Sequence, residues 1–203
     1  MKTRTLHKVI GLALLLPFAG WIITALVFYF KPGYAAAYEA LHIKTYPLDG
    51  RVSIPADSAW LEFRYLRTIL GNHLIVHTAE GWMQLEPATL RPREKPTNEE
   101  IRLLLTDAFS ANPQRYGQVA TISNDTITTS TNILIFLDWD GLSLYQRGPD
   151  TDRIDLLYRI HYLQWTGVSA LDKILGPLGL ALLLVLSILG IRLAVGSGKR
   201  DPQ

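Results

Sequence analysis

The chain has 203 residues, which leaves room for one globular domain and two membrane spans. Its formal net charge of +2 is too small and too scattered to indicate binding to nucleic acid, so we expect no such partner. The absence of cysteine excludes disulfides, thiolate metal sites and a cysteine nucleophile.

Two apolar stretches lie near the two ends of the chain, and residues 10–30 and 174–191 within them carry no charge. The first, residues 10–30, covers about 31 Å as a helix, which is close to the thickness of a hydrocarbon core. The second, residues 174–195, matches it if Arg192 extends toward the headgroups. A soluble protein this small has too little chain to cover two such helices. We therefore predict a two-pass membrane protein that has the lipid bilayer as a partner.

A cleaved signal peptide is the competing interpretation of the first stretch. Three basic residues precede it, and the alanines at 35–37 resemble a cleavage site. However, signal peptides have apolar regions of about 7–15 residues, and this one is longer. Its aromatic end, Tyr29 and Phe30, is typical of a membrane interface. We expect the first span to be retained.

The flanking charges predict the orientation in the membrane. Basic residues precede the first span and lie at or beyond the end of the second: Lys2, Arg4, Lys8, Arg192, Lys199 and Arg200. The positive-inside rule then places residues 1–9 and 196–203 in the cytoplasm and residues 31–173 outside. In a bacterium the spans would cross the inner (cell) membrane, and the central domain would be periplasmic in a Gram-negative cell.

The central region contains an internal repeat at an offset of 60 residues. Residues 73–85 align with residues 133–145, and each reads as an apolar strand, an acidic-Gly turn and a second strand. Residues 38–44 align with the start of a helix after Pro96, where Thr97 and Glu100 form a capping-box pattern.

The fold class follows from this repeat. We predict an α+β membrane protein in which two transmembrane helices bracket two αβββ units with antiparallel sheets, at about residues 37–92 and 97–150. An amphipathic helix is expected at about residues 153–166, because Leu156, Ile160 and Leu163 recur at helical spacing. It would lie at the outer membrane surface or against the domain, with His161 near the headgroups.

Three short motifs resemble the PepSY-associated transmembrane family. Residues 6–12, Leu-His-Lys-Val-Ile-Gly-Leu, are similar to the opening of its first span. Residues 160–167 look like a stretched Leu-His-Thr-Gly element, and residues 176–190 are similar to its Gly-rich terminal helix. The two αβββ units match PepSY repeats in outline. Larger relatives have additional spans, and some bind haem and reduce ferric siderophores; this chain departs from that plan.

The histidines are the candidate haem ligands that this resemblance implies, because cysteine is absent and methionine is scarce. His7 and His161 would be the axial ligands, yet they lie on opposite sides of a span of roughly 30 Å. One chain therefore cannot supply both, although a symmetric dimer would pair His161 with its own copy. The competing interpretation is that both histidines are structural.

The remaining candidate ligands do not form a metal site. His73 and His77 share one face of a predicted strand but lie roughly 13 Å apart, and His42 on the first predicted helix has no clustered partners. Asp150, Asp152 and Asp155 form only a loose acidic loop. We predict no metal site and no catalytic residues, since no phosphate loop, nucleophile elbow or zinc-protease motif occurs.

These observations favour a non-enzymatic, membrane-anchored PepSY-type module that binds or regulates a protein or peptide in the periplasm. The alternative is a haem-binding redox component related to ferric-siderophore reductases, acting as a dimer. Peptidase inhibition, the role proposed for some PepSY domains, is a third hypothesis that rests on the resemblance alone.

Overall fold

The computed structural model describes residues 3–50, 52–54, 57–124 and 126–197. The chain forms two compact units. The helical unit combines the residues up to Tyr34 with those from Asp152 onward, and the sheet unit consists of residues 35–151.

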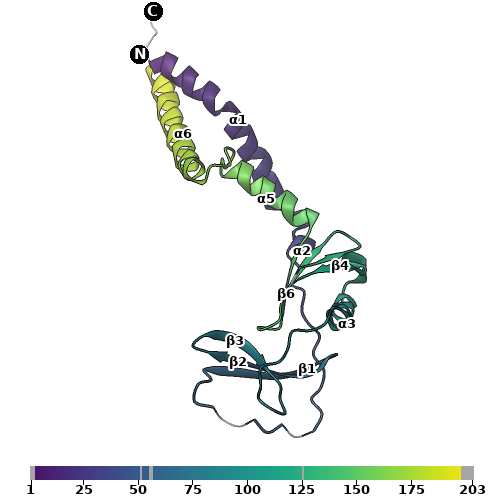
Figure 1. Cartoon of the computed structure of the whole chain (residues 1–203). Helices are drawn as coiled ribbons and strands as arrows, with labels where there is room; N and C mark the ends of the chain where they lie inside the picture. The colour runs from purple at the N-terminus through teal and green to yellow at the C-terminus, as the bar shows by residue number, and fades with distance from the viewer. Residues whose placement is uncertain (1–2, 51, 55–56, 125, 198–203) are drawn as a thin grey trace, which may run out of the picture. The chain divides into compact units, whose positions relative to one another are not determined.

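Two long helices dominate the helical unit: α1 (Thr3–Phe30) and α6 (Ser169–Ser197). They are antiparallel, so the start of α1 and the end of α6 lie at the same end of the pair (Figure 1). Ile10 and Leu14 of α1 are buried against Leu189 of α6. Leu6, Leu182, Leu183 and Leu186 pack against these residues, so the two helices meet along an apolar contact.

Most other side chains of these helices point away from the protein. Leu12 is 76% exposed, Leu16 70% and Leu184 64%. A helix in the core of a soluble protein would bury such residues, and in water their exposure would be unfavourable. Both helices are long and apolar enough to cross a membrane, as predicted. Their exposed apolar side chains support a two-pass membrane protein.

A shorter helix, α5 (Pro149–His161), precedes α6 and joins the helical unit from Asp152 on. It begins four residues before the predicted helix at 153–166 and ends five residues before it does. The helix stops here because Leu163 adopts a left-handed conformation (φ 56°), and Gly167 (φ 72°) permits a second turn before α6.

The sheet unit contains two antiparallel sheets. The first has three strands in sequence order, β1 (Glu62–Thr68), β2 (Gly71–Thr78) and β3 (Gly81–Leu85). Leu74, Val76 and Leu85 pack on one face under Ile54 and Trp60. The predicted hairpin at Glu80-Gly81 is confirmed, since Thr78 pairs with Gly81 across a two-residue turn.

The second sheet follows the predicted capped helix. Its elements are α3 (Asn98–Phe109), α4 (Pro113–Tyr116), β4 (Val119–Ser123), β5 (Thr126–Thr129), β6 (Leu134–Asp138) and β7 (Ser143–Arg147). The strand order is β4-β5-β6-β7, so β7 is an edge strand. The capping box of Thr97 and Glu100 is present. Apolar residues of α3, among them Leu104 and Leu105, form the main core with Ile127 and Ile135 of the sheet.

The helix expected at residues 38–44 is absent. The short helix α2 (Tyr34–Ala37) ends before it, and the chain then runs extended. Alternate residues Ala37, Glu39 and Leu41 are more buried than their neighbours, which is the period of a strand and not of a helix. The two halves are therefore unlike within the residues that the structure describes: the first has three strands and no helix after residue 37, whereas the second has α3, α4 and four strands.

Candidate functional sites

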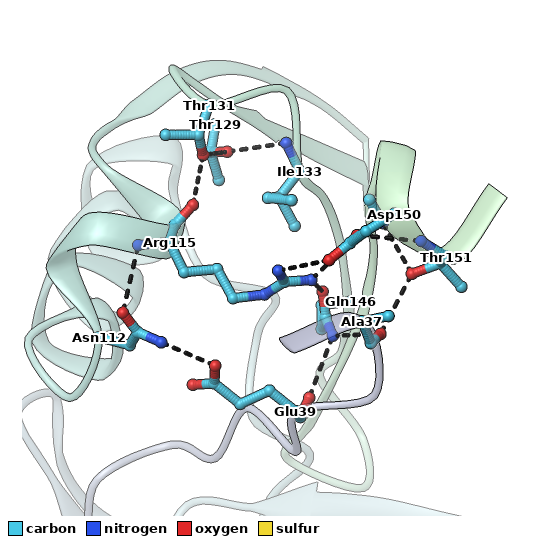
Figure 2. A network of polar contacts seen from close by, with 11 residues as sticks. Ala37, Glu39, Asn112, Arg115, Thr129, Thr131, Ile133, Gln146, Asp150 and Thr151 are labelled. Atoms are coloured by element: carbon cyan, nitrogen blue, oxygen red, sulfur yellow. Dashed lines mark hydrogen bonds and ion pairs between the residues drawn. The ribbon is translucent and has the colours of Figure 1, made fainter. Parts of the chain in front are cut away.

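The extended residues 37–45, here called the strap, are held to the second sheet by side chains. Gln146 on β7 donates from its Nε2 to the carbonyl oxygens of Ala37 (3.0 Å) and Glu39 (3.1 Å). The hydroxyl of Thr151 also donates to the oxygen of Ala37 (3.1 Å). The strap is thus fixed at its start by one amide and one hydroxyl (Figure 2).

Arg115 of α4 organises this attachment. Its guanidinium donates to Asp150 Oδ2 (2.8 Å) and to Gln146 Oε1 (2.8 Å), so it orients the amide that holds the strap (Figure 2). The Arg115 side chain is only 9% exposed and that of Asp150 is 29% exposed. Burial opposes both charges, but their hydrogen bonds and mutual attraction prevail, so the pKa of Asp150 is lowered and that of Arg115 is raised.

Neighbouring side chains complete the network. Asn112, the N-cap of α4, accepts from the backbone N–H of Arg115 (3.2 Å) and donates to Glu39 Oε2 (2.8 Å). The hydroxyl of Thr131 donates to the backbone oxygen of Arg115 (2.6 Å). Because Ala37 and Thr151 lie at the two borders of the sheet unit, the network joins the points where the chain enters and leaves it.

A cavity of ≈ 460 Å³ opens between the strap and β7. Residues 37–43 and Thr45 of the strap and residues 142–146 of the second sheet face it, with Leu66 of β1 and Thr151. Ligand pockets in proteins are typically on the order of 300–1,000 Å³. β1 and β7 are each one of the two edge strands of their sheets, so both sheets present an edge residue to this cavity.

The lining of the cavity mixes apolar residues such as Leu66 and Leu144 with the polar side chains of Glu39, His42 and Gln146. The described residues include no group of three His, Asp or Glu side chains placed to hold a metal ion.

His73 on β2 occupies a buried site that the sequence did not reveal. Its Nδ1 lies 2.8 Å from Gln84 Oε1 and 3.2 Å from a guanidinium nitrogen of Arg93. Because the Gln84 oxygen can only accept and its contact is the shorter, the proton is assigned to Nδ1. Its Nε2 then accepts from the Thr68 hydroxyl (2.8 Å), which itself accepts from the N–H of Leu70 (3.0 Å). Every hydrogen bond of the neutral ring is satisfied, and burial lowers the pKa of His73.

Trp139 covers this site from the second sheet. Its ring meets His73 edge-on at 5.7 Å between centroids, and its backbone oxygen accepts a hydrogen bond from Gln84 Nε2. Arg93 lies over the other part of the Trp139 ring at 5.7 Å. His77, on the same strand, stacks on Trp82 near the surface (4.6 Å) and does not share a site with His73.

His161, a predicted haem ligand, ends α5 and contacts α1. Its Nδ1 is 2.8 Å from the hydroxyl of Thr24. Thr24 uses its single hydroxyl hydrogen on the carbonyl oxygens of Gly20 (2.6 Å) and Trp21 (3.2 Å), so His161 Nδ1 must be the donor. The indole N–H of Trp21 donates to the backbone oxygen of His161 (2.7 Å). The lone pair of His161 therefore resides on Nε2.

His7, the second predicted ligand, lies far from His161. It packs on Gly190 near the opposite end of the helix pair, and its Nδ1 is buried with no hydrogen-bond partner among the described residues. Seventeen residues of α1 separate His7 from Thr24, which corresponds to roughly 26 Å. The two imidazoles of one chain do not fit the two axial positions of a single haem.

Two acidic residues of the second half, Asp138 and Asp150, have structural partners. Asp138 Oδ1 accepts from the N–H of Gly141 (3.1 Å) in the β6–β7 turn, and Asp150 pairs with Arg115.

Comparison of the chain with protein-family models, with curated proteins and with solved structures finds no match.

Proposed function

We propose that the chain is a two-pass membrane protein of PepSY type whose central domain holds an extended polypeptide segment of a partner protein. The observation that carries this proposal is the ≈ 460 Å³ cavity between the strap and β7. A membrane-anchored module of this kind would bind or regulate its partner without catalysing a reaction.

An extended peptide suits the cavity for two reasons. An edge strand has backbone N–H and C=O groups directed out of its sheet, and peptides often bind by extending such an edge. The cavity walls supply apolar contacts from Leu66 and Leu144 and polar contacts from Gln146 and Glu39, a mixture that gives affinity together with orientation.

Ala40 provides the direct test, because it is exposed and faces the cavity. The indole of the Ala40→Trp variant should fill the cavity. Binding of a peptide selected from a randomised library should then weaken at least about tenfold, because the peptide loses one or two well-packed side-chain contacts. Fluorescence anisotropy of labelled peptides with the detergent-purified protein measures this change.

Leu61→Trp is the matched control, since Leu61 is 70% exposed and does not line the cavity. It should leave peptide affinity unchanged. Equal binding by the wild type and Ala40→Trp, or equal losses in both variants, would contradict the proposed site.

We also propose that the spans cross a bacterial inner membrane with both termini in the cytoplasm. This orientation is supported by the basic residues that lie near the two chain ends. Lys8 in α1 and Arg192 in α6 are two of them, and Lys2, Arg4, Lys199 and Arg200 lie closer to the termini. A reporter fused after Gln203 should be active only in a form that reports cytoplasmic location. Activity of a periplasm-dependent reporter at that position would overturn the orientation.

Haem binding by a dimer is the second candidate function. His161 favours it in one respect: Thr24 fixes Nδ1 as the donor, which leaves Nε2 as the atom able to ligate iron. A haem so held would carry electrons to an acceptor outside the membrane. The absorption spectrum of protein purified from haem-supplied cells decides the matter, because a Soret band that shifts on reduction is required and its absence excludes this function.

A further inference from the structure

The contacts between α1 and α6 show where charged residues begin at the end of the helix pair near His161. A methyl group built on Gly179 would lie 3.3 Å from the Trp21 ring, so these two residues are level. Lys173 precedes Gly179 by six residues, and Thr24 follows Trp21 by three. In antiparallel helices Lys173 therefore lies about one turn, roughly 5 Å, beyond Thr24. Lys173 marks the edge of the apolar region, and His161 sits just inside it.

A small pocket of ≈ 220 Å³ adjoins His161 at this level. Its lining residues are Trp21, His161, Tyr162, Gly176 and Leu180. Three of the five have aromatic rings and none carries a formal charge with histidine neutral. The indole N–H of Trp21 is already used on the His161 oxygen, so the pocket offers π faces and no free indole donor.

The polar character of the pocket comes from His161. Because Nδ1 donates to Thr24, Nε2 is an acceptor, and it makes no hydrogen bond within the described part of the chain. A ligand that satisfies this site must bring an N–H or O–H donor. Aromatic faces around that donor further favour a cation.

We propose that this pocket binds the primary ammonium group of a phospholipid headgroup, as in phosphatidylethanolamine. The ammonium would donate one hydrogen bond to His161 Nε2 and lie against the rings of Trp21 and Tyr162. The position of the pocket within one turn of Lys173 matches the headgroup boundary, and Lys173 supplies positive charge for the phosphate of the same lipid.

The carboxylate at this level, that of Asp172, does not line the pocket. Asp172 Oδ1 accepts from the backbone N–H (3.0 Å) and the hydroxyl (2.7 Å) of Thr166. These bonds orient Asp172 toward the α5–α6 turn. The neutral imidazole is therefore the acceptor that the pocket presents to an ammonium.

The proposed chemistry predicts selectivity among lipids. Choline has a quaternary ammonium with no N–H, so it can contact the rings but cannot donate to His161. Glycerol headgroups have hydroxyl donors and no cationic centre. A primary ammonium satisfies both features, and the loss of a hydrogen bond to a charged group corresponds to about tenfold in affinity.

Native mass spectrometry of the full-length protein tests the proposal, with equal amounts of phosphatidylethanolamine, phosphatidylcholine and phosphatidylglycerol in the reconstituted bilayer. The wild type should retain phosphatidylethanolamine about tenfold over the other two. His161→Phe keeps the aromatic volume and removes the acceptor, so it should abolish this preference. His7→Phe, the matched control at the opposite end of α1, should keep it.

One further variant and one competition measurement complete the test. Thr24→Val removes the hydroxyl that fixes the imidazole, and it should reduce the preference even if His161→Phe fails to fold. Free ethanolamine at millimolar concentration should not displace the lipid; displacement would mean that the pocket recognises the amine alone and would refute the lipid assignment. Equal retention of the three lipids by the wild type, or a preference unchanged in a folded His161→Phe, would overturn the proposal.

Discussion

Replacing Arg115 by alanine should lower the free energy of unfolding of the sheet unit by about 3 kcal/mol. Removing one member of a buried ion pair leaves the other charge without its partner, which typically costs about 3–5 kcal/mol, and Asp150 is partly exposed, so the lower end applies. Gln146 also loses the donor that orients its amide. Chemical unfolding of the full-length protein in detergent, followed by tryptophan fluorescence, measures the change.

Arg64→Ala is the matched control, since Arg64 pairs with Glu62 at 2.9 Å but both side chains are about half exposed, 53% and 50%. Exposed ion pairs contribute about 0–1 kcal/mol, and the contact of Arg64 with the Trp82 ring (4.3 Å) contributes about 0.5–1 kcal/mol, so this variant should lose clearly less stability than Arg115→Ala. Hydrogen exchange should locate the effect of Arg115→Ala in the strap and in residues 146–151. Equal unfolding midpoints for the two variants would show that the network around Arg115 does not stabilise the domain.

Acidification from pH 7 to pH 5 should destabilise the sheet unit through His73. The folded protein holds this imidazole neutral, with a pKa lowered by burial, whereas in the unfolded chain its pKa is about 6.5. The unfolded state therefore binds more protons as the pH falls. The stabilising contribution is complete above about pH 6.5 and is lost below it, by at most about 1.4 kcal/mol per pH unit.

The His73→Asn variant isolates this effect. Asparagine retains a donor for Gln84 and does not titrate, so the variant should be less stable at pH 7 yet lose less stability between pH 7 and pH 5 than the wild type. His77→Asn, on the same strand but near the surface, should keep the wild-type pH dependence. Parallel pH profiles for the wild type and His73→Asn would exclude His73 as the cause. The window lies above pH 5 to separate it from Glu100 and Asp150, whose lowered pKa values act in more acidic solution.

The elements that the sequence predicted correctly are those with strong local signals. The apolar stretches at 10–30 and 174–195 correspond to α1 and α6, because length and the absence of charge determine such helices without tertiary contacts. The capped start of α3 and the hairpin between β2 and β3 also follow from adjacent residues, through capping bonds and turn geometry.

The strap illustrates what adjacent residues do not determine. Residues 38–44 align with a helix elsewhere in the chain, yet a side-chain amide from Gln146, more than 100 residues away, holds the start of this segment extended. Alternate burial of Glu39 and Leu41 follows from the sheet unit that they meet. Long-range hydrogen bonds and core contacts outweigh local helical preference here, because the preference of each residue is small.

His161 and His73 also show which features depend on adjacent residues and which depend on tertiary contacts. Sequence alone predicted that His161 lies just before the second apolar helix, since the apolar boundary and the aromatic residues beside it are local features. Only the tertiary structure brought Thr24 and Trp21 of α1 to it and so determined which ring nitrogen carries the proton. Likewise, His73 reads as an ordinary strand residue until Gln84, Thr68 and Trp139 enclose it, because burial and hydrogen-bond partners depend on packing between elements distant in the chain.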